Sequence, residues 1–394
     1  MSTNTEVNNK EGGLYVHIPF CRNKCLYCDF YTGGVRIARW NEYVDSLLAE
    51  LVSRENEMNF EVSTLYLGGG TPSLMPTLEL LRLVKGINKI SKREKYEEFT
   101  IEVNPEDVTD EKIEAWRECG VSRISLGVQT LNDSELKNIG RRHSKADVEE
   151  AYDKLTNTFN NISLDVMFGI PGQTIDSYRE TLKNIIKLSP SHISSYSLML
   201  EEGTAMTLLA REGKIILPDE DEWIEMTRLT NTLLQKAGYI RYETSNYAKP
   251  GKESRHNLKY WKGNPYIGLG PGAHSYNGDR VRRGNPNDLK GYIDRFYKGG
   301  NMERFFDEEI LGEEEIREEM LMTRLRMKEG LDLKEYYERF GEKRGEILVA
   351  QAEKLQKTGF MKLEKEKVSL TDEGYLISDS IILKLLEVPP QSRS

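Results

Sequence analysis

Hydrophobic and polar positions divide residues 12–200 into two kinds of segment. Six short runs rich in β-branched and aromatic residues predict strands, and segments of helical length lie between them. The expected strands are 12–17, 62–67, 98–103, 121–126, 161–167 and 192–198, and the expected helices are 36–54, 77–91, 109–118, 144–159 and 174–188. Such alternation predicts βα units that build a parallel sheet.

Six βα units are too few to close an eight-stranded barrel. We therefore expect an α/β fold, an open partial (β/α)6 barrel of the TIM type, over residues 1–218. Residues 219–304 form a connecting region, with a helix near 220–237 followed by a loop-rich stretch. Residues 305–394 predict a smaller α+β domain of winged-helix type, with a charged helical region, a small strand pair and a closing helix.

Composition and charge narrow the class of protein. The chain has 394 residues, 38% of them hydrophobic and 30% charged, which is typical of a soluble globular protein with more than one domain. A net charge of −9, with an acidic helix expected at 307–319, argues against nucleic-acid binding. No apolar run is long enough to span a bilayer, and the first residues lack the pattern of a secretory signal, so we expect a cytoplasmic protein.

Three of the four cysteines lie close together. Cys21, Cys25 and Cys28 have the spacing C-x3-C-x2-C directly after the first expected strand. Thiolates suit zinc or an iron–sulfur cluster, but a structural zinc site needs four ligands, and Phe30 stands where a fourth cysteine would close the group. A cubane cluster held by three cysteines instead leaves one iron open to a small chelating molecule.

Other polar and glycine-rich positions follow the later strands. The segment GGGTPS (68–73) follows the second, while Glu102, Gln129 and Asp165 lie at or near the ends of the third, fourth and fifth. Each alone is more simply a turn or a paired polar residue. Together they lie on the carboxyl-terminal rim, where parallel barrels build their sites.

These motifs resemble the radical S-adenosylmethionine (SAM) superfamily. The segments LYVHIPFCRNKCLYCDF, LYLGGGTPS, IEVNPE, SLGVQTLN and DVMFGIPGQT resemble, in the same order, its branch of anaerobic coproporphyrinogen III dehydrogenase (HemN), and the likeness extends from about residue 13 to 385. The resemblance implies a [4Fe-4S] cluster on the three cysteines, with SAM on the open iron. It implies SAM contacts by Tyr15, Tyr27, Gly69, Gly70, Thr71, Glu102, Gln129, Arg141 and Asp165.

Two departures indicate a particular family within this branch. The dehydrogenases carry a further cysteine at the position of Phe30 and a longer N-terminal segment, whereas the chain is similar to the haem chaperones. HNLKYW (256–261) also fits their H-N-x-x-Y-W pattern, which implies His256 as a haem-binding residue, although a lone loop histidine is more often simply packed. The resemblance implies haem as cargo and delivery to an acceptor protein, such as a membrane respiratory enzyme, which would bring the chain to the membrane through that partner.

Several alternatives stay open. The chain could oxidatively decarboxylate coproporphyrinogen III, catalyse another radical SAM reaction, or bind zinc alone. The residues do not say whether SAM is cleaved, which haem acceptor is served or whether the chain forms a homodimer. Cys119 and the glycine-rich segment 268–276 are interpreted as structural.

Overall fold

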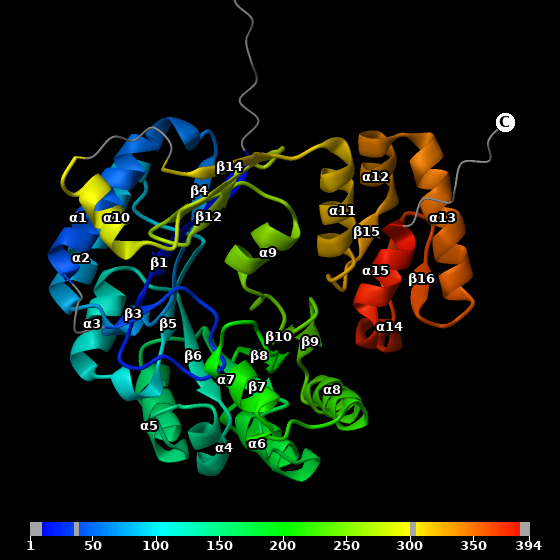
Figure 1. The fold of residues 1–394 in the computed structure, drawn as a ribbon, viewed down its shortest axis with the longest axis horizontal. Helices are drawn as coiled ribbons and strands as arrows, with labels where there is room; N and C mark the ends of the chain where they lie inside the picture. The colour runs from blue at the N-terminus through cyan, green and yellow to red at the C-terminus, as the bar shows by residue number, and fades with distance from the viewer. Residues whose placement is uncertain (1–9, 35–38, 300–304, 387–394) are drawn as a thin grey trace, which may run out of the picture.

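A twelve-stranded sheet forms the centre of the larger part of the molecule. The computed structural model describes residues 10–34, 39–299 and 305–386. The strand order is β14-β13-β12-β11-β1-β4-β5-β6-β7-β8-β10-β9. The sheet is curved, and a smaller domain lies beside its concave side (Figure 1).

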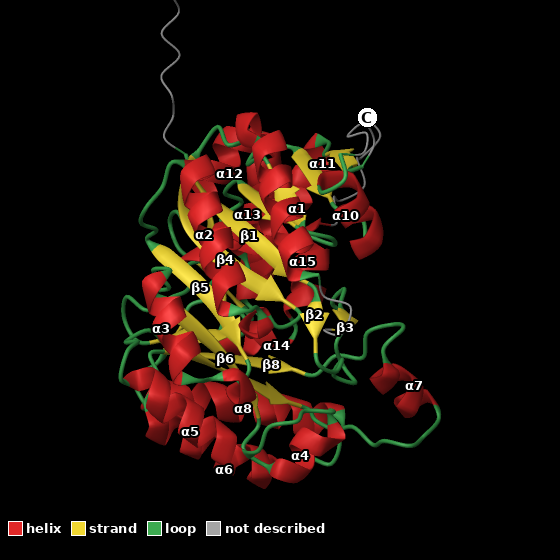
Figure 2. Ribbon diagram, turned by 90° about the vertical axis from the view of Figure 1, so that its left-hand side faces the viewer, coloured by secondary structure: helices red, strands yellow, loops and turns green. Residues whose placement is uncertain are grey.

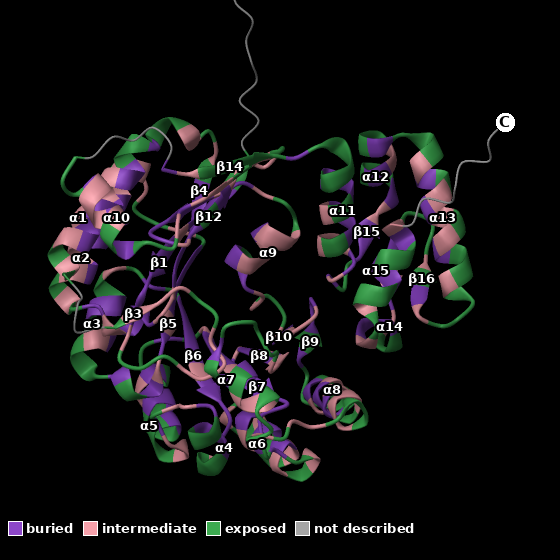
Figure 3. Ribbon diagram, viewed as in Figure 1, coloured by how far each residue is buried: buried purple, intermediate pink, exposed green. Residues whose placement is uncertain are grey.

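All six predicted strands are present, and they are consecutive neighbours in the sheet. Each pairs in parallel with the next, from β1 to β8. Both faces of these strands are largely buried, which explains why their sequences are nearly continuous apolar runs (Figure 3). The predicted partial barrel is therefore confirmed. The strands are β1 (Glu11–Ile18), β4 (Glu61–Gly69), β5 (Glu98–Val103), β6 (Arg123–Gln129), β7 (Ile162–Phe168) and β8 (His192–Ser197).

Helices cover the convex face of the sheet. Several begin at a side chain that accepts a backbone N–H, as Thr109, Ser144, Thr174 and Asp219 do. The predicted helices are α1 (Trp40–Ser53), α2 (Thr77–Ser91), α3 (Asp110–Glu118), α5 (Lys145–Thr156), α6 (Ile175–Leu188) and α8 (Glu220–Lys236). The expected start of the first, at 36–38, lies outside the described residues. Before residue 219, two short helices were not predicted, α4 (Asp133–Asn138) and α7 (Ala205–Arg211), and α7 projects from the body (Figure 2).

The loop-rich prediction for the stretch after 237 was wrong. This stretch extends the sheet at both edges and contains a helix inside the curve, α9. Gly268 lies so close to the next strand that a Cβ there would be 2.1 Å from the carbonyl oxygen of His274, so this glycine permits strand pairing rather than marking a loop. The acidic segment 307–310 is likewise a strand. The elements are β9 (Ile240–Arg241), β10 (Asn246–Ala248), α9 (Arg255–Trp261), β11 (Tyr266–Leu269), β12 (His274–Tyr276), β13 (Val281–Gly284), α10 (Leu289–Phe296) and β14 (Asp307–Ile310).

The C-terminal domain has its own hydrophobic core, which includes Leu321, Leu325, Leu331 and Val368. Helices pack there against a three-stranded sheet, as expected for a winged-helix-like α+β domain. Its elements are α11 (Glu313–Arg324), β15 (Leu331–Asp332), α12 (Leu333–Phe340), α13 (Glu342–Gln356), β16 (Met361–Leu363), β17 (Lys367–Leu370), α14 (Asp372–Leu376) and α15 (Ser378–Leu386). Among the described residues, no helix combines the length and apolar character needed to cross a membrane.

The C-terminal domain contacts both edges of the large sheet. At one edge, β14 leads into α11, and Arg282 of β13 pairs with Glu319 of α11 at 2.8 Å. At the other, the Lys328 amide donates to the Tyr242 carbonyl at 2.9 Å, and Arg241 pairs with Asp372 at 2.8 Å. The domain thus joins the two ends of the open barrel.

A buried carboxylate fastens α1 to the added strands. Glu50 is fully buried, and its oxygens accept from Tyr292 Oη at 2.6 Å, Asn285 Nδ2 at 2.9 Å, the Gly270 amide at 2.9 Å and Arg54 Nη1 at 3.2 Å. Burial raises the pKa of Glu50. Removal of the carboxylate would leave Tyr292 Oη and the Gly270 amide without an acceptor, whereas Asn285 would keep the Gly270 carbonyl and Arg54 would keep Glu57.

Replacement of Glu50 by leucine should therefore destabilise the barrel by about 2–4 kcal/mol, because it leaves the Tyr292 hydroxyl and the Gly270 amide buried without an acceptor and leaves Arg54 with Glu57 as its remaining carboxylate. Chemical denaturation followed by far-ultraviolet circular dichroism measures the change in the free energy of unfolding. Glu42→Ala, on the same helix but paired with an exposed arginine, should cost no more than about 1 kcal/mol. Equal midpoints for the two variants would contradict this account of the network.

Candidate functional site

The loop that carries the three cysteines follows β1 at the carboxyl-terminal rim. It begins in β2 (Phe20–Cys21), which pairs with β3 (Gly33–Gly34). Its middle is held by two backbone hydrogen bonds of Leu26, whose amide donates to Ile139 at 3.1 Å and whose carbonyl accepts from Met206 at 2.9 Å. The loop is thus held between the end of α4 and the start of α7.

The three sulfurs are half-buried thiols with donors nearby. Thr71 Oγ1 donates to Cys21 Sγ at 3.4 Å, and Arg141 Nη1 lies 3.7 Å from Cys25 Sγ. Burial raises the pKa of Cys28 to about 11 and also raises that of Cys21, so these thiols are protonated at neutral pH until a metal replaces the proton. The hydroxyl and the guanidinium supply hydrogen bonds to sulfur of the kind that accompany iron–sulfur clusters.

No other thiol lies in this loop. Phe30 is 58% exposed, and Cys119 packs at α2 and α3, where burial raises its pKa to about 12. Among the described residues, no three His, Cys, Asp or Glu side chains converge on the position of one metal ion. A cubane does not need such convergence, because each thiolate binds a different iron. The donor set therefore fits a cluster held by three cysteines.

Glycines at the end of β4 allow the next loop to lie directly against the cysteine loop. Gly69 has φ of +109°, and its amide donates to Glu102 Oε2 at 3.0 Å. A Cβ on Gly70 would be 2.8 Å from the carbonyl oxygen of Ile18 and 3.0 Å from the amide nitrogen of Phe20. Backbone rather than flexible side chain occupies that space, so position 70 requires glycine.

Glu102 is oriented by two hydrogen bonds. Besides the Gly69 amide, Tyr66 Oη donates to its other oxygen at 2.8 Å. Burial raises the pKa of Glu102 to about 7. A ligand ammonium group beside this carboxylate would favour its ionised form, which is the chemistry required of the predicted SAM contact.

Gln129 and Asp165 occupy the next two strands. Gln129 has φ of +66°, unusual for a residue other than glycine, and accepts from Tyr196 Oη at 3.0 Å. Asp165 accepts from Ser125 Oγ at 2.9 Å and Ser163 Oγ at 3.1 Å, and burial raises its pKa. Hydrogen bonds from hydroxyl groups therefore hold both side chains in place.

Arg141 connects the cysteine loop to the ends of two strands. Its Nη2 donates to Asn104 Oδ1 and to the Gly127 carbonyl, each at 2.7 Å. Its Nε is buried and has no hydrogen-bond partner among the described residues. An unsatisfied buried donor beside Cys25 is consistent with a polar ligand at this position.

Tyr27 and Tyr15 complete the set of predicted SAM contacts. Tyr27 lies in the cysteine loop and packs against a small cluster with Ile139 and Met206. The Tyr15 hydroxyl lies 3.0 Å from His17 Nδ1, and its ring is 6.0 Å from that of Tyr66. Direct contacts link Cys21 to Thr71, Gly69 to Glu102 and Cys25 to Arg141, while the SAM roles of all these residues stay predictions.

His256 lies apart from the cysteine loop, within the curve of the sheet. It is 1% exposed, and both ring nitrogens are engaged at 2.8 Å, Nδ1 with Thr64 Oγ1 and Nε2 with Tyr260 Oη. Burial lowers its pKa to about 3, so the imidazole is neutral. To bind iron, it would have to exchange one of these partners for the metal.

Two residues at this position were missed in the sequence. Glu98, which is 2% exposed, accepts from the backbone amides of Arg255 at 2.8 Å and His256 at 3.0 Å, and so fixes the first turn of α9 to the barrel. The Tyr66 ring lies 5.1 Å from the His256 ring and donates its hydroxyl to Glu102. The alternation along β4, with Thr64, Tyr66 and Gly68 on one face, was the signal for Tyr66.

A partial parallel barrel with three cysteines on the loop after its first strand defines the radical SAM class of proteins. In agreement, residues 15–185 match the family model of the Radical SAM superfamily, and residues 311–377 match the HemN C-terminal domain. The chain belongs to the family of the haem chaperone HemW. It is 35% identical to "Heme chaperone HemW" of Bacillus subtilis, covering 93% of this chain and 97% of the relative, and 34% identical to that of Lactococcus lactis, covering 96% and 98%.

A solved structure supports the fold. The chain aligns with "Coproporphyrinogen III oxidase (HemN) from Escherichia coli is a Radical SAM enzyme" with a TM-score of 0.81 and 23% identity, covering 96% of this chain and 91% of that one.

Membership of the radical SAM superfamily implies a [4Fe-4S] cluster and SAM as cofactors. When bound, such a cluster supplies an electron that can split the SAM sulfonium.

Removal of any one cluster thiolate should abolish the cluster. Cys21→Ala, Cys25→Ala and Cys28→Ala should each lose nearly all iron, sulfide and charge-transfer absorbance after anaerobic reconstitution. Cys119→Ala should retain them, because that thiol packs between helices. Loss of the cluster in the Cys119 variant would show that the ligands are assigned wrongly.

Gly70→Ala tests the close approach of the two loops without removing a ligand. The methyl group meets backbone that cannot move separately, so we expect a destabilisation of about 1–3 kcal/mol and reduced iron incorporation. Gly34→Ala, where a Cβ would have no neighbour within 4 Å, is the matched control. Thermal melting and iron content compare the two, and identical behaviour would argue against the required glycine.

Proposed function

We propose that this chain is a haem chaperone, which binds haem and transfers it to an acceptor protein, and that its barrel carries a [4Fe-4S] cluster and SAM. The observation that carries the proposal is α9. The HNLKYW motif forms this helix, and Glu98 fixes its first turn to the barrel while Tyr260 and Trp261 at its other end remain half-exposed. Aromatic surface of this kind suits a flat macrocycle.

The cluster and SAM roles follow the predicted residues. Cys21, Cys25 and Cys28 bind the cluster, and SAM occupies the open iron. Carboxylates, backbone groups and an arginine then contact SAM. The proposed SAM contacts are Tyr15, Tyr27, Gly69, Gly70, Thr71, Glu102, Gln129, Arg141 and Asp165. Their clustering on one rim and the unsatisfied Nε of Arg141 support this assignment.

His256 has a role in haem binding in this proposal. As an iron ligand, it would release Tyr260 and use Nε2 for the metal. The low pKa of the imidazole keeps it neutral, the form that binds iron. If it stays in place, it instead orients Tyr260 through the existing hydrogen bond.

The remaining parts of the proposal concern partners. The acceptor is a respiratory enzyme of the membrane, and the chaperone works in the cytoplasm and reaches the membrane through that enzyme. The proposal also includes self-association into a homodimer. Measurement of the molecular mass in solution, with and without SAM, would test it.

An anaerobic haem titration of the cluster-reconstituted chain tests the function. We expect the Soret band to saturate near one haem per chain. His256→Ala should weaken binding roughly 10–100-fold, because the substitution removes a ligand or the residue that orients Tyr260. His274→Ala, an exposed histidine, is the control and should bind normally.

A second assay separates the chaperone from an enzyme of the same fold. Transfer of bound haem to apomyoglobin should proceed, and coproporphyrinogen III incubated with SAM and a reductant should remain unchanged. Absence of saturable haem binding, or turnover of the porphyrinogen, would contradict the proposal.

A further inference from the structure

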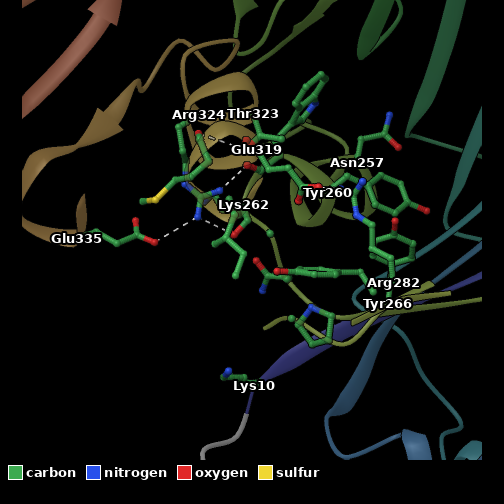
Figure 4. Close-up of a pocket in the computed structure, with 18 of the residues that line it drawn as sticks. Lys10, Asn257, Tyr260, Lys262, Tyr266, Arg282, Glu319, Thr323, Arg324 and Glu335 are labelled. Carbon is green, nitrogen blue, oxygen red and sulfur yellow. Dashed lines mark hydrogen bonds and ion pairs between the residues drawn. The ribbon is translucent and has the colours of Figure 1, made fainter. Parts of the chain in front are cut away.

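A pocket of about 730 Å³ lies between the barrel and the C-terminal domain (Figure 4). One wall comes from α9 and the strands beyond it, and the other from α11 and α12. The barrel side contributes Tyr260, Trp261, Tyr266 and Tyr276. The volume is typical of a site for one organic cofactor.

Both walls carry apolar or aromatic side chains, interspersed with polar ones such as Asn257 and Thr323. Tyr266 lies edge-to-face with Tyr260, with ring centroids 4.6 Å apart, and 6.5 Å from the Tyr276 ring. Across the space, α11 presents Ile316 and Met320. Aromatic side chains that face apolar ones across a gap suit a large flat ring.

The rim of the pocket is basic, although the chain as a whole carries a net charge of −9. Five basic and two acidic side chains line it, which leaves three positive charges in excess. They are Lys10, Lys262, Arg282, Arg324 and Arg339, against Glu319 and Glu335.

Two of the five basic side chains of the pocket form ion pairs with its two glutamates. Arg282 pairs with Glu319 at 2.8 Å, and Arg324 with Glu335 at 3.4 Å. Arg324 also donates to the backbone carbonyls of Trp261 and Lys262, so it ties α11 to the end of α9. The surplus charge therefore belongs to Lys10, Lys262 and Arg339.

We propose that this pocket binds haem, with the macrocycle between the aromatic wall and α11 and with Lys262, Arg339 and Lys10 on its two propionates. This inference rests on the proposed chaperone function and adds the site. Lysine and arginine form strong charge-assisted hydrogen bonds with carboxylates. Because Arg339 belongs to α12, the C-terminal domain supplies part of the haem site.

The test compares haem with its dimethyl ester, in which both propionate charges are masked. The full-length, cluster-reconstituted chain should bind the ester about ten-fold more weakly than haem. Arg339→Gln and Lys262→Gln should each weaken haem binding about three- to ten-fold and leave ester binding unchanged. Lys343→Gln, exposed on α13, is the matched control and should change neither affinity.

The outcomes distinguish the site from the function. If the parent chain binds haem and ester equally, or if the two rim variants bind haem as the control does, the pocket is not the haem site, while the chaperone function stands. If the parent chain shows no saturable haem binding, the chaperone function fails first. A thermal melt of each variant verifies folding, and the haem–ester comparison on the parent chain needs no variant.

Discussion

The arrangement of the candidate site depends above all on the hydrogen bonds of the Arg141 guanidinium. A buried cation is stable only when neighbouring groups accept its hydrogen bonds. Arg141 finds them on three separate segments: Cys25 in the cysteine loop, Asn104 after β5 and Gly127 in β6. The same residue therefore sets the distance between the thiols and the rim of the barrel.

The cysteine loop is held by backbone contacts as well as by side chains, among them Arg22, which pairs with Asp107 at 2.8 Å. Leu26 bonds to the segments around Ile139 and Met206, and the glycine loop lies against Ile18 and Phe20. Backbone contacts leave the three thiols as the reactive groups of the loop. Because these contacts fix the loop, three of only four cysteines in the chain are enough to form a specific metal site.

The fold was largely predictable because each central strand is buried on both faces and so appears as an apolar run. The parts that were missed depend on contacts distant in sequence. The helix α9 has seven residues and is fixed by Glu98, which is 158 positions from His256. Strand β11 contains Gly268, whose role is the close approach of His274, and neither effect is visible from local propensity.

For the candidate site, motif order predicted which residues lie on the rim, but not how they are held. The positive φ of Gln129 and the two hydrogen bonds of Glu102 arise only in the folded sheet. Tyr66 was missed because its importance comes from what it touches, Glu102 on one side and His256 on the other. The place of His256 on a helix was missed for the same reason, since Glu98 and Thr64, which hold this helix and the imidazole, are distant in sequence. The histidine is packed as well as helical, and its haem-binding role stays a prediction.

The attachment of the C-terminal domain has a consequence for the behaviour of the chain in concentrated solution. An open barrel leaves two terminal strands whose unpaired backbone groups could template the pairing of other chains. Here β14 leads directly into α11 at one end, and residues around Tyr242 bond to the domain through Lys328 at the other. The domain thus covers part of the sheet edge near Tyr242, whereas β14 is exposed and carries the charges of Asp307, Glu308 and Glu309, which oppose pairing with another chain. A chain that ended before Leu311 would expose the edge near Tyr242 even with every cysteine in place.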